Sequence, residues 1–289
     1  MNTLSELKKR ILLPASLLLV ALIASGCGFQ IVSGSGKIAT ETRAVSGFTS
    51  VTLAGIGDVY VSQGEAQPVR IEADDNLIPY FETVVEGSTL KIGLKNQYIG
   101  INLRPTRPIK FYVSLPKIEA ITLAGSGNIF GGTLKTEAIS ISLLGSGNIS
   151  ADSLTATALD LHLSGSGNIR LAAVSAGQVT ASIGGSGDIN MDALSAQKIS
   201  AKISGSGNFI LSGKAADQSV DILGSGAYRA ADLKGETASV RVTGSGNSQV
   251  SVTGTLNVTI LGSGDVTYSG TPKVTTSVAG SGKVVPAAQ

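Results

Sequence analysis

The stretch Ile141-Ser142-Leu143-Leu144-Gly145-Ser146-Gly147-Asn148-Ile149 is one copy of a motif that recurs along most of the chain. Its Gly-Ser-Gly tripeptide begins at residues 125, 145, 165, 185, 205, 224, 244, 262 and 280, in steps of 18 to 20 residues. A fixed period of this length is the sequence signature of a repeat protein, and it decides the fold.

Apolar and polar residues alternate around each Gly-Ser-Gly. Two positions before the first glycine, all nine copies hold a large aliphatic residue: Leu123, Leu143, Leu163, Ile183, Ile203, Ile222, Val242, Ile260 and Val278. Four positions after it, eight of the nine are apolar: Ile129, Ile149, Ile169, Ile189, Phe209, Tyr228, Ser248, Val266 and Val284. The residue three positions before the glycine is polar in every copy. This alternation indicates strands with one buried face, and we expect two or three short strands per copy.

A unit of about 20 residues cannot bury its apolar face alone, whereas stacked units bury theirs in continuous columns. The repeat therefore predicts a parallel β-solenoid with turns about 4.8 Å apart. We expect Gly-Ser-Gly to form a corner, because glycine adopts positive φ without a Cβ clash. The Asn or Asp that follows in most copies tolerates left-handed backbone and predicts a polar ladder along the corners. A helical bundle is excluded, because the glycines would break every helix.

Residues 1–26 have the features of a bacterial secretion signal. Basic residues at positions 8–10 precede an apolar stretch, 11–24, that is too short to span a bilayer as a mature helix. Ala24-Ser25-Gly26-Cys27 then resembles the lipobox of bacterial lipoproteins, although Ala24 stands where leucine is usual. We predict a signal peptide over residues 1–26 and lipidation of Cys27, which would anchor the protein to the membrane. The alternative is a signal-anchor helix with an incidental cysteine.

Cys27 is the only cysteine, so an internal disulfide is excluded. By analogy with other bacterial lipoproteins, Gly28 directly after it indicates export to the outer membrane of the cell envelope. Of the 22 basic and 20 acidic residues, three basic and one acidic lie within residues 1–26, which leaves 19 of each. Because no basic stripe remains, we expect no nucleic-acid partner.

The remaining chain divides into three parts. Residues 27–45, which include Ser33-Gly34-Ser35-Gly36, predict a flexible tether. Residues 46–118 hold strand-like runs without a regular period, and we expect them to form an irregular β cap, because an open strand edge invites aggregation. Residues 119–285 are the predicted regular solenoid. The 37 glycines and the aromatic content of only 4% fit small stacked turns.

An ordered set of motifs resembles the bacterial head GIN domain family. They are Phe48-Thr49-Ser50-Val51, Gly55-Ile56-Gly57-Asp58-Val59, Asp74-Asp75-Asn76-Leu77, Leu90-Lys91-Ile92 and Ser114-Leu115-Pro116. The resemblance covers roughly residues 46–285. Members of this family are labelled auto-transporter adhesins and are often lipoproteins or envelope proteins. The resemblance implies a right-handed β-helix, which agrees with the periodicity, and it supplies no catalytic residues to transfer.

The sequence predicts no catalytic residue, no cofactor site and no metal site. His162 is the only histidine, and its position in the repeat predicts a solvent-exposed side chain without an acid beside it. The sequence has no cluster of His or Cys residues that could bind zinc. The Gly-Ser-Gly-Lys sequences that begin at Gly34 and Gly280 lack the other residues of a phosphate-binding loop. The position directly after each Gly-Ser-Gly favours an amide ladder over a calcium site, because only Asp188 and Asp265 supply carboxylates there. The nine residues at this position are Asn128, Asn148, Asn168, Asp188, Asn208, Ala227, Asn247, Asp265 and Lys283.

Three functional hypotheses follow. The favoured one is a non-enzymatic, adhesin-like binding module of the envelope, which uses a long flat face of Ser, Thr and Asn to bind a glycan or an envelope protein. The second is a structural or scaffold protein that engages a protein partner through residues 46–118. The third is a polysaccharide-active enzyme, since polysaccharide lyases share this architecture. The third lacks support in the sequence, because the outward columns are mostly Ser, Thr, Ala and single charges.

Overall fold

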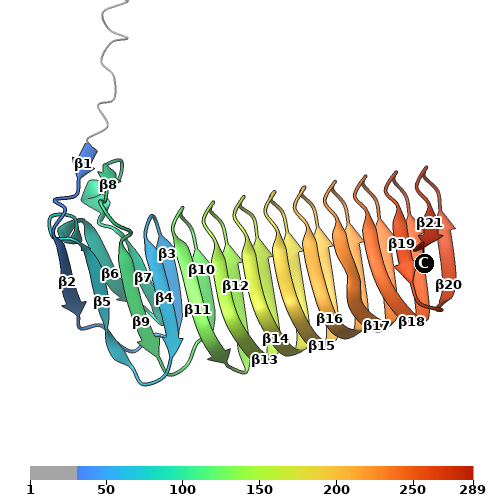
Figure 1. Cartoon of the computed structure of the whole chain (residues 1–289), viewed down its shortest axis with the longest axis horizontal. Coiled ribbons are helices and arrows are strands. Elements are labelled where there is room, and N and C mark those ends of the chain that lie inside the picture. The colour runs from blue at the N-terminus through green and yellow to red at the C-terminus, as the bar shows by residue number, and fades with distance from the viewer. Residues whose placement is uncertain (1–30, 289) are drawn as a thin grey trace, which may run out of the picture.

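The computed structural model describes residues 31–288, which form an all-β solenoid of about eight turns (Figure 1). The predicted β-solenoid with turns of about 20 residues is confirmed. The predicted signal peptide and Cys27 lie outside the described residues. Helical structure within residues 31–288 is confined to the 3-10 turns η1 (Ile78–Tyr80) and η2 (Asn96–Tyr98), and no helix there is long and apolar enough to cross a bilayer.

Each central turn of the solenoid is one long bent strand. These strands are β13 (Ile149–Leu163), β14 (Ile169–Ile183), β15 (Ile189–Ile203), β16 (Phe209–Ile222), β17 (Tyr228–Val242) and β18 (Ser248–Ile260). The prediction of two or three short strands per copy is wrong for these turns. Ala156 and Ala176 are small, buried and paired in register, so parallel pairing continues through the middle of these strands.

The turns at both ends of the array are divided into shorter strands. They are β10 (Ala120–Leu123), β11 (Asn128–Lys135) and β12 (Ala138–Leu143) at the start, and β19 (Val266–Ser269), β20 (Lys273–Val278) and β21 (Val284–Pro286) at the end. All of them pair parallel with the neighbouring turn.

The aliphatic columns form the core, as predicted. From Leu123 to Ile260, every residue two positions before a corner is at most 1% exposed. Val278 is the exception, because it belongs to the last turn, which is covered on one side only. The inward-facing Gln218 is satisfied inside the core: its side chain accepts a hydrogen bond from the Tyr228 hydroxyl (3.0 Å) and donates one to the Leu233 carbonyl (3.2 Å).

The corner glycines are required for a different reason from the one the sequence suggested. None of the Gly-Ser-Gly glycines from Gly125 onward has φ in the left-handed region, so the expected use of positive φ is wrong. A Cβ on Gly147 would instead lie 1.6 Å from the carbonyl oxygen of Gly127, and a Cβ on Gly165 would lie 1.8 Å from that of Gly145. Successive corners stack so closely that only glycine fits at these two positions of each corner.

A polar ladder runs along the corners, as predicted. The side-chain oxygen of Asn148 accepts the backbone N–H of Asn168 (3.1 Å), and that of Asn168 accepts the N–H of Asp188 (2.9 Å). Asp188 in turn accepts both the backbone and the side-chain N–H of Asn208, each at 2.8 Å. No Asn or Asp within residues 31–288 adopts positive φ, so these side chains act through hydrogen bonds alone.

Antiparallel strands cover the N-terminal end of the solenoid and form the predicted β cap. Its strands are β2 (Ile38–Arg43), β5 (Gln67–Asp74), β6 (Phe81–Glu86), β7 (Thr89–Leu94) and β9 (Lys110–Leu115). The cap joins the array through β3 (Ser50–Ala54) and β4 (Asp58–Gln63), because these strands pair with the cap on one side and with the first regular turn on the other.

The segment expected to be a flexible tether, residues 27–45, is largely folded where the structure describes it. Strand β1 (Ile31–Ser33) pairs with β8 (Asn102–Arg104), and β2 pairs antiparallel with β5 over its whole length. The expectation of a tether is therefore wrong for residues 31–43, because their backbone hydrogen bonds are made with the cap.

We predict that Gly147→Ala destabilises the solenoid by on the order of 3 kcal/mol, because the new Cβ would overlap the Gly127 carbonyl. The melting temperature should fall by on the order of 10 °C. Gly132→Ala is the matched control, since nothing lies within 4 Å of a Cβ at Gly132. Thermal unfolding followed by circular dichroism measures both variants, and equal melting temperatures would contradict the close packing of the corners.

Candidate functional site

The only histidine of the chain has a solvent-exposed side chain, as predicted. His162 is exposed on β13, and its Nδ1 lies 2.7 Å from the Ser182 hydroxyl of the next turn. Among residues 31–288, no group of three or more His, Cys, Asp or Glu side chains is arranged to hold a metal ion. Cys27, the predicted lipidation site, lies outside the described residues.

Two adjacent outward columns form a long polar face, which we call the hydroxyl face. Its residues on β12 to β18 are Ser140 and Ser142, Asp160 and His162, Thr180 and Ser182, Ser200 and Lys202, Ser219 and Asp221, Ser239 and Arg241, and Asn257 and Thr259. All of them are at least partly exposed. The parallel register places equivalent residues about 4.8 Å apart along the axis, so the face is a regular array of donors and acceptors.

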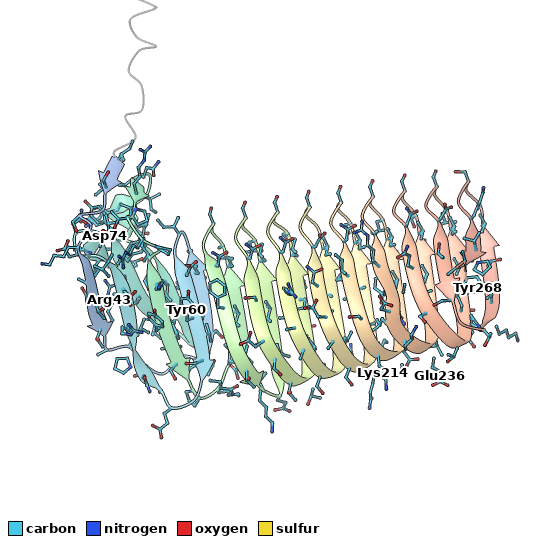
Figure 2. The ribbon with its side chains drawn as sticks, in the orientation of Figure 1. Arg43, Tyr60, Asp74, Lys214, Glu236 and Tyr268 are labelled. Carbon is cyan, nitrogen blue, oxygen red and sulfur yellow. The ribbon has the colours of Figure 1, made fainter. Side chains whose placement is uncertain are left out.

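The outward surface near the cap carries an aromatic ladder instead. The Tyr112 and Tyr60 rings stack at 5.3 Å, and Tyr60 stacks on Phe130 at 5.1 Å. The Arg70 guanidinium lies 3.7 Å from the centre of the Tyr112 ring and covers the end of this ladder. Because β5, β9, β4 and β11 supply one member each, the ladder joins the cap to the first regular turn. Figure 2 labels Tyr60, which lies between Tyr112 and Phe130 in this ladder.

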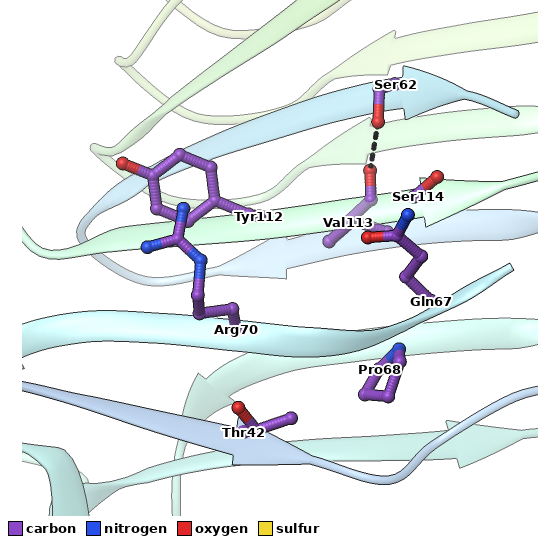
Figure 3. A pocket seen from close by; sticks show the side chains of 8 residues that line it. All are labelled: Thr42, Ser62, Gln67, Pro68, Arg70, Tyr112, Val113 and Ser114. Carbon is purple, nitrogen blue, oxygen red and sulfur yellow. Dashed lines mark hydrogen bonds between the residues drawn. The ribbon is translucent and has the colours of Figure 1, made fainter. Parts of the chain in front are cut away.

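A polar pocket of about 330 Å³ opens beside the Arg70–Tyr112 pair (Figure 3). It lies where the pairing of β5 with β9 shifts register between Gln67 and Arg70, and Ser62 and Ser114 also line it. The Ser62 hydroxyl donates to the Val113 carbonyl at 3.3 Å. The pocket thus offers guanidinium, amide and hydroxyl groups, which can hydrogen-bond a polyhydroxylated ligand.

A second, more apolar groove of about 460 Å³ follows the segments around residues 44–49, 66–68 and 114–116. Val45, Phe48 and Pro116 contribute apolar surface to it. The two hollows share Gln67, Pro68 and Ser114, so they lie next to each other on the cap.

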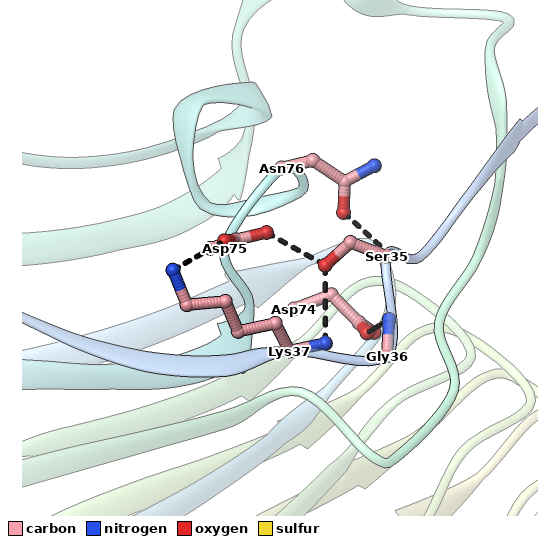
Figure 4. A network of polar contacts seen from close by, with 6 residues as sticks. All are labelled: Ser35, Gly36, Lys37, Asp74, Asp75 and Asn76. Atoms are coloured by element: carbon pink, nitrogen blue, oxygen red, sulfur yellow. Dashed lines mark hydrogen bonds and ion pairs between the residues drawn. The ribbon is translucent and has the colours of Figure 1, made fainter.

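The chain entering the cap is fixed by a polar network around Asp74 (Figure 4). The buried Asp74 carboxylate accepts the Gly36 N–H (2.8 Å), the Thr106 N–H (2.9 Å) and the Thr106 hydroxyl (2.7 Å). Asp75 accepts a hydrogen bond from the Ser35 hydroxyl at 2.6 Å. The Asp74 carboxylate therefore connects the turn between β1 and β2 to the loop after β8.

These contacts lower the pKa of Asp74. Its hydrogen bond from the Thr106 hydroxyl is the largest cause, and together with the backbone N–H groups it outweighs the opposing effect of burial. The pKa of Asp75 is lowered chiefly by the Ser35 hydroxyl. A carboxyl group whose pKa is lower in the folded state contributes stability above its unfolded pKa, and this contribution is lost as the pH falls through the folded pKa.

We predict that Asp74→Asn lowers the melting temperature at pH 7, because the new amide cannot accept all three hydrogen bonds. The difference from the wild type should shrink as the pH falls below about 4, because Asp74 of the unfolded chain then takes up a proton and the stability contributed by the charged, folded carboxylate is lost. Thermal unfolding between pH 7 and pH 3 measures it, with the exposed Asp232→Asn as control. A difference that stays constant over this range would contradict a charged Asp74.

Only part of this arrangement could be predicted from the sequence. Tyr60 and Phe130 each lie five positions after a corner glycine, so the repeat itself places them in one column. Arg70 and Tyr112 lie outside the period, and nothing in the sequence brings them beside Tyr60. The hydrogen-bond partners of Asp74 could not be predicted either, because Gly36 and Thr106 are 38 and 32 residues away in the chain.

Comparison with solved structures finds the same fold in relatives. A structure titled a putative lipid binding protein, from Parabacteroides distasonis, is 26% identical with a TM-score of 0.67, covering 90% of this chain and 100% of its own. A putative adhesin from Parabacteroides merdae is 21% identical (TM-score 0.68, 90% and 100% covered), and another from Parabacteroides distasonis is 24% identical (0.62, 89% and 100%). A search of curated proteins gave no match.

The family comparison agrees with the motifs. The matching model is described as "Putative auto-transporter adhesin, head GIN domain", and it matches residues 47–209 and 171–272. The two matches span the cap and most of the array, which is well over half of the chain. The chain therefore belongs to the head GIN domain family.

Proposed function

We propose that this protein is an exported, lipid-anchored module of the bacterial envelope that binds its partner in an adhesin-like way without catalysis. The family is described as an adhesin family and not as an enzyme family. The leader and the lipobox-like Ala24-Ser25-Gly26-Cys27 support export, lipidation of Cys27 and retention at the outer membrane. An adhesin family suggests an envelope or surface location, which agrees with such an anchor.

The hydroxyl face is the observation that carries this proposal. Its side chains are mostly short, so a partner can approach the sheet closely along seven turns. Charges of both signs, such as Lys202, Asp221 and Arg241, are interspersed, so the face does not select ligands by net charge. A polymer with repeating hydroxyl groups fits such an array, and we propose an envelope or surface glycan as the first partner and an envelope protein as the other.

We predict that Thr180→Arg with Ser219→Arg abolishes glycan binding, because two long charged side chains would block the hydroxyl face. The matched control is Thr155→Arg with Ser195→Arg, which has the same spacing on exposed positions of a different column. Binding to a glycan array and to envelope fragments measures the effect. Undiminished binding by the face variant, or equal loss in the control, would contradict the role of this face.

We predict that Cys27→Ala prevents palmitate incorporation, because no thiol remains for acylation. Labelling of cells with radioactive palmitate, followed by detergent phase separation, measures this. Ser25→Ala keeps a small residue in the lipobox-like sequence and should behave as the wild type. A Cys27→Ala variant that keeps its label would rule out this anchor.

The apolar groove of the cap favours a second candidate, a scaffold that binds a protein partner. Phe48, Val45 and Pro116 give it the apolar character of a protein-binding groove. Crosslinking from Ser46 in living cells would distinguish the two functions. One stoichiometric protein partner favours the scaffold, whereas its absence together with glycan binding favours the adhesin-like module.

A further inference from the structure

A small projection stands out from the cap at the point where the described chain begins (Figure 1). We call it the knob and define it as residues 31–37 and 95–108. It contains η2 and the two-stranded parallel sheet of β1 and β8, which is separate from the main sheet. None of the proposed binding surfaces described above includes it.

The knob is strongly basic. It holds Lys37, Lys95, Arg104 and Arg107, and it contains no Asp or Glu. Lys37 makes an exposed ion pair with Asp75 (3.5 Å), whereas the other three cations have no acidic partner among residues 31–288. From residue 27 onward the chain has no net charge, so the four cations of the knob, set against only Asp74 and Asp75 of the adjoining cap, distinguish it from the solenoid.

The knob also exposes large apolar side chains. Ile99 is 72% exposed, more than any other large hydrophobic residue in the described chain, and Ile31 on β1 is 50% exposed. Beside Ile99, the Tyr98 ring packs on Tyr80 at 4.6 Å, which holds η2 against the cap. Exposed aliphatic residues surrounded by cations are typical of surfaces that insert shallowly into the headgroup region of a bilayer.

The knob is held rigidly on the cap. Thr106, between Arg104 and Arg107, is bound by the Asp74 carboxylate, and the Gly34 N–H donates to the Arg104 carbonyl at 2.8 Å. A Cβ on Gly34 would lie 2.3 Å from the Asp74 carboxylate, so the two segments are tightly packed. The cations and the isoleucines are therefore presented in a fixed arrangement.

The position of the knob in the chain indicates its partner. Four Cα–Cα steps separate Cys27 from Ile31, which is a reach of at most about 14 Å. A lipid on Cys27 would bring the knob to the headgroups, where a further contact with the bilayer adds to the anchoring. Positive charge next to such an anchor complements anionic headgroups.

We propose that the knob binds an anionic lipid surface through Arg104, Arg107 and Lys95 while Ile99 and Ile31 enter the headgroup layer. This contact adds to the proposed anchoring but does not need the acyl chain. It can therefore be tested on a chain that starts at Gly28 and has neither leader nor Cys27. Every strand and the whole buried core described above lie within residues 31–288, so this chain keeps its fold.

The test is co-sedimentation of this chain with vesicles of phosphatidylcholine, with and without phosphatidylglycerol. We expect binding only to the anionic vesicles, and weaker binding as salt is added. Arg104→Gln with Arg107→Gln should weaken it roughly 20-fold, and Ile99→Ser about fivefold. The control is Arg170→Gln with Arg229→Gln, two exposed arginines of the solenoid outside the hydroxyl face that should leave binding unchanged.

The proposal is overturned if anionic vesicles bind no better than neutral ones, or if the control pair weakens binding as much as the knob pair. Equal binding to soluble heparin or DNA would also overturn it, because the knob would then recognise polyanions in general. Melting temperatures of all variants must match the wild type. Failure here would leave the tests of Cys27 and of the hydroxyl face unaffected, because neither uses this truncated chain.

Discussion

The structure depends on the direct contact between peptide groups of successive corners. At every corner from Gly125 onward, a Cβ on either glycine would lie 1.6 to 2.2 Å from a carbonyl oxygen of the preceding turn. The carbonyl of the first glycine of a corner is also a hydrogen-bond acceptor: that of Gly145, for example, accepts the Ser166 N–H at 3.1 Å. The absence of side chains therefore lets the turns hydrogen-bond at the corners, and this contact keeps the long strands in register and the aliphatic residues in columns.

The period of the sequence was sufficient to predict this array. Residues such as Leu143, Leu163 and Ile183 recur at one position of the repeat, and stacking is the only arrangement that buries them all. The mechanism at the corners could not be predicted, because φ and the distance between turns are properties of the stacked structure. The same limit explains why two or three short strands were predicted where the structure has one bent strand, since both have the same alternation of apolar and polar residues.

The cap was less predictable, because its decisive contacts join segments far apart in the chain. Ser33-Gly34-Ser35-Gly36 has the composition of a flexible linker, and it is ordered by Asp74, Asp75 and Asn76, about 40 residues later. The stack of Tyr112 on Tyr60 likewise joins two residues that are 52 positions apart in the chain. Composition describes how a segment behaves alone, whereas these segments take their conformation from partners that no local pattern identifies.

The place of the knob also affects how the molecule is oriented. It adjoins the turn between β3 and β4, since the N–H of Asp58, the first residue of β4, donates to the carbonyl of Ile109 (2.7 Å), directly after the knob. In Figure 1 the knob lies on the same upper edge as the Gly-Ser-Gly corners. A surface that meets the knob therefore runs alongside the array and does not meet it end-on. Adding or losing repeats would then change the footprint of the protein along that surface while its height above the surface stayed the same.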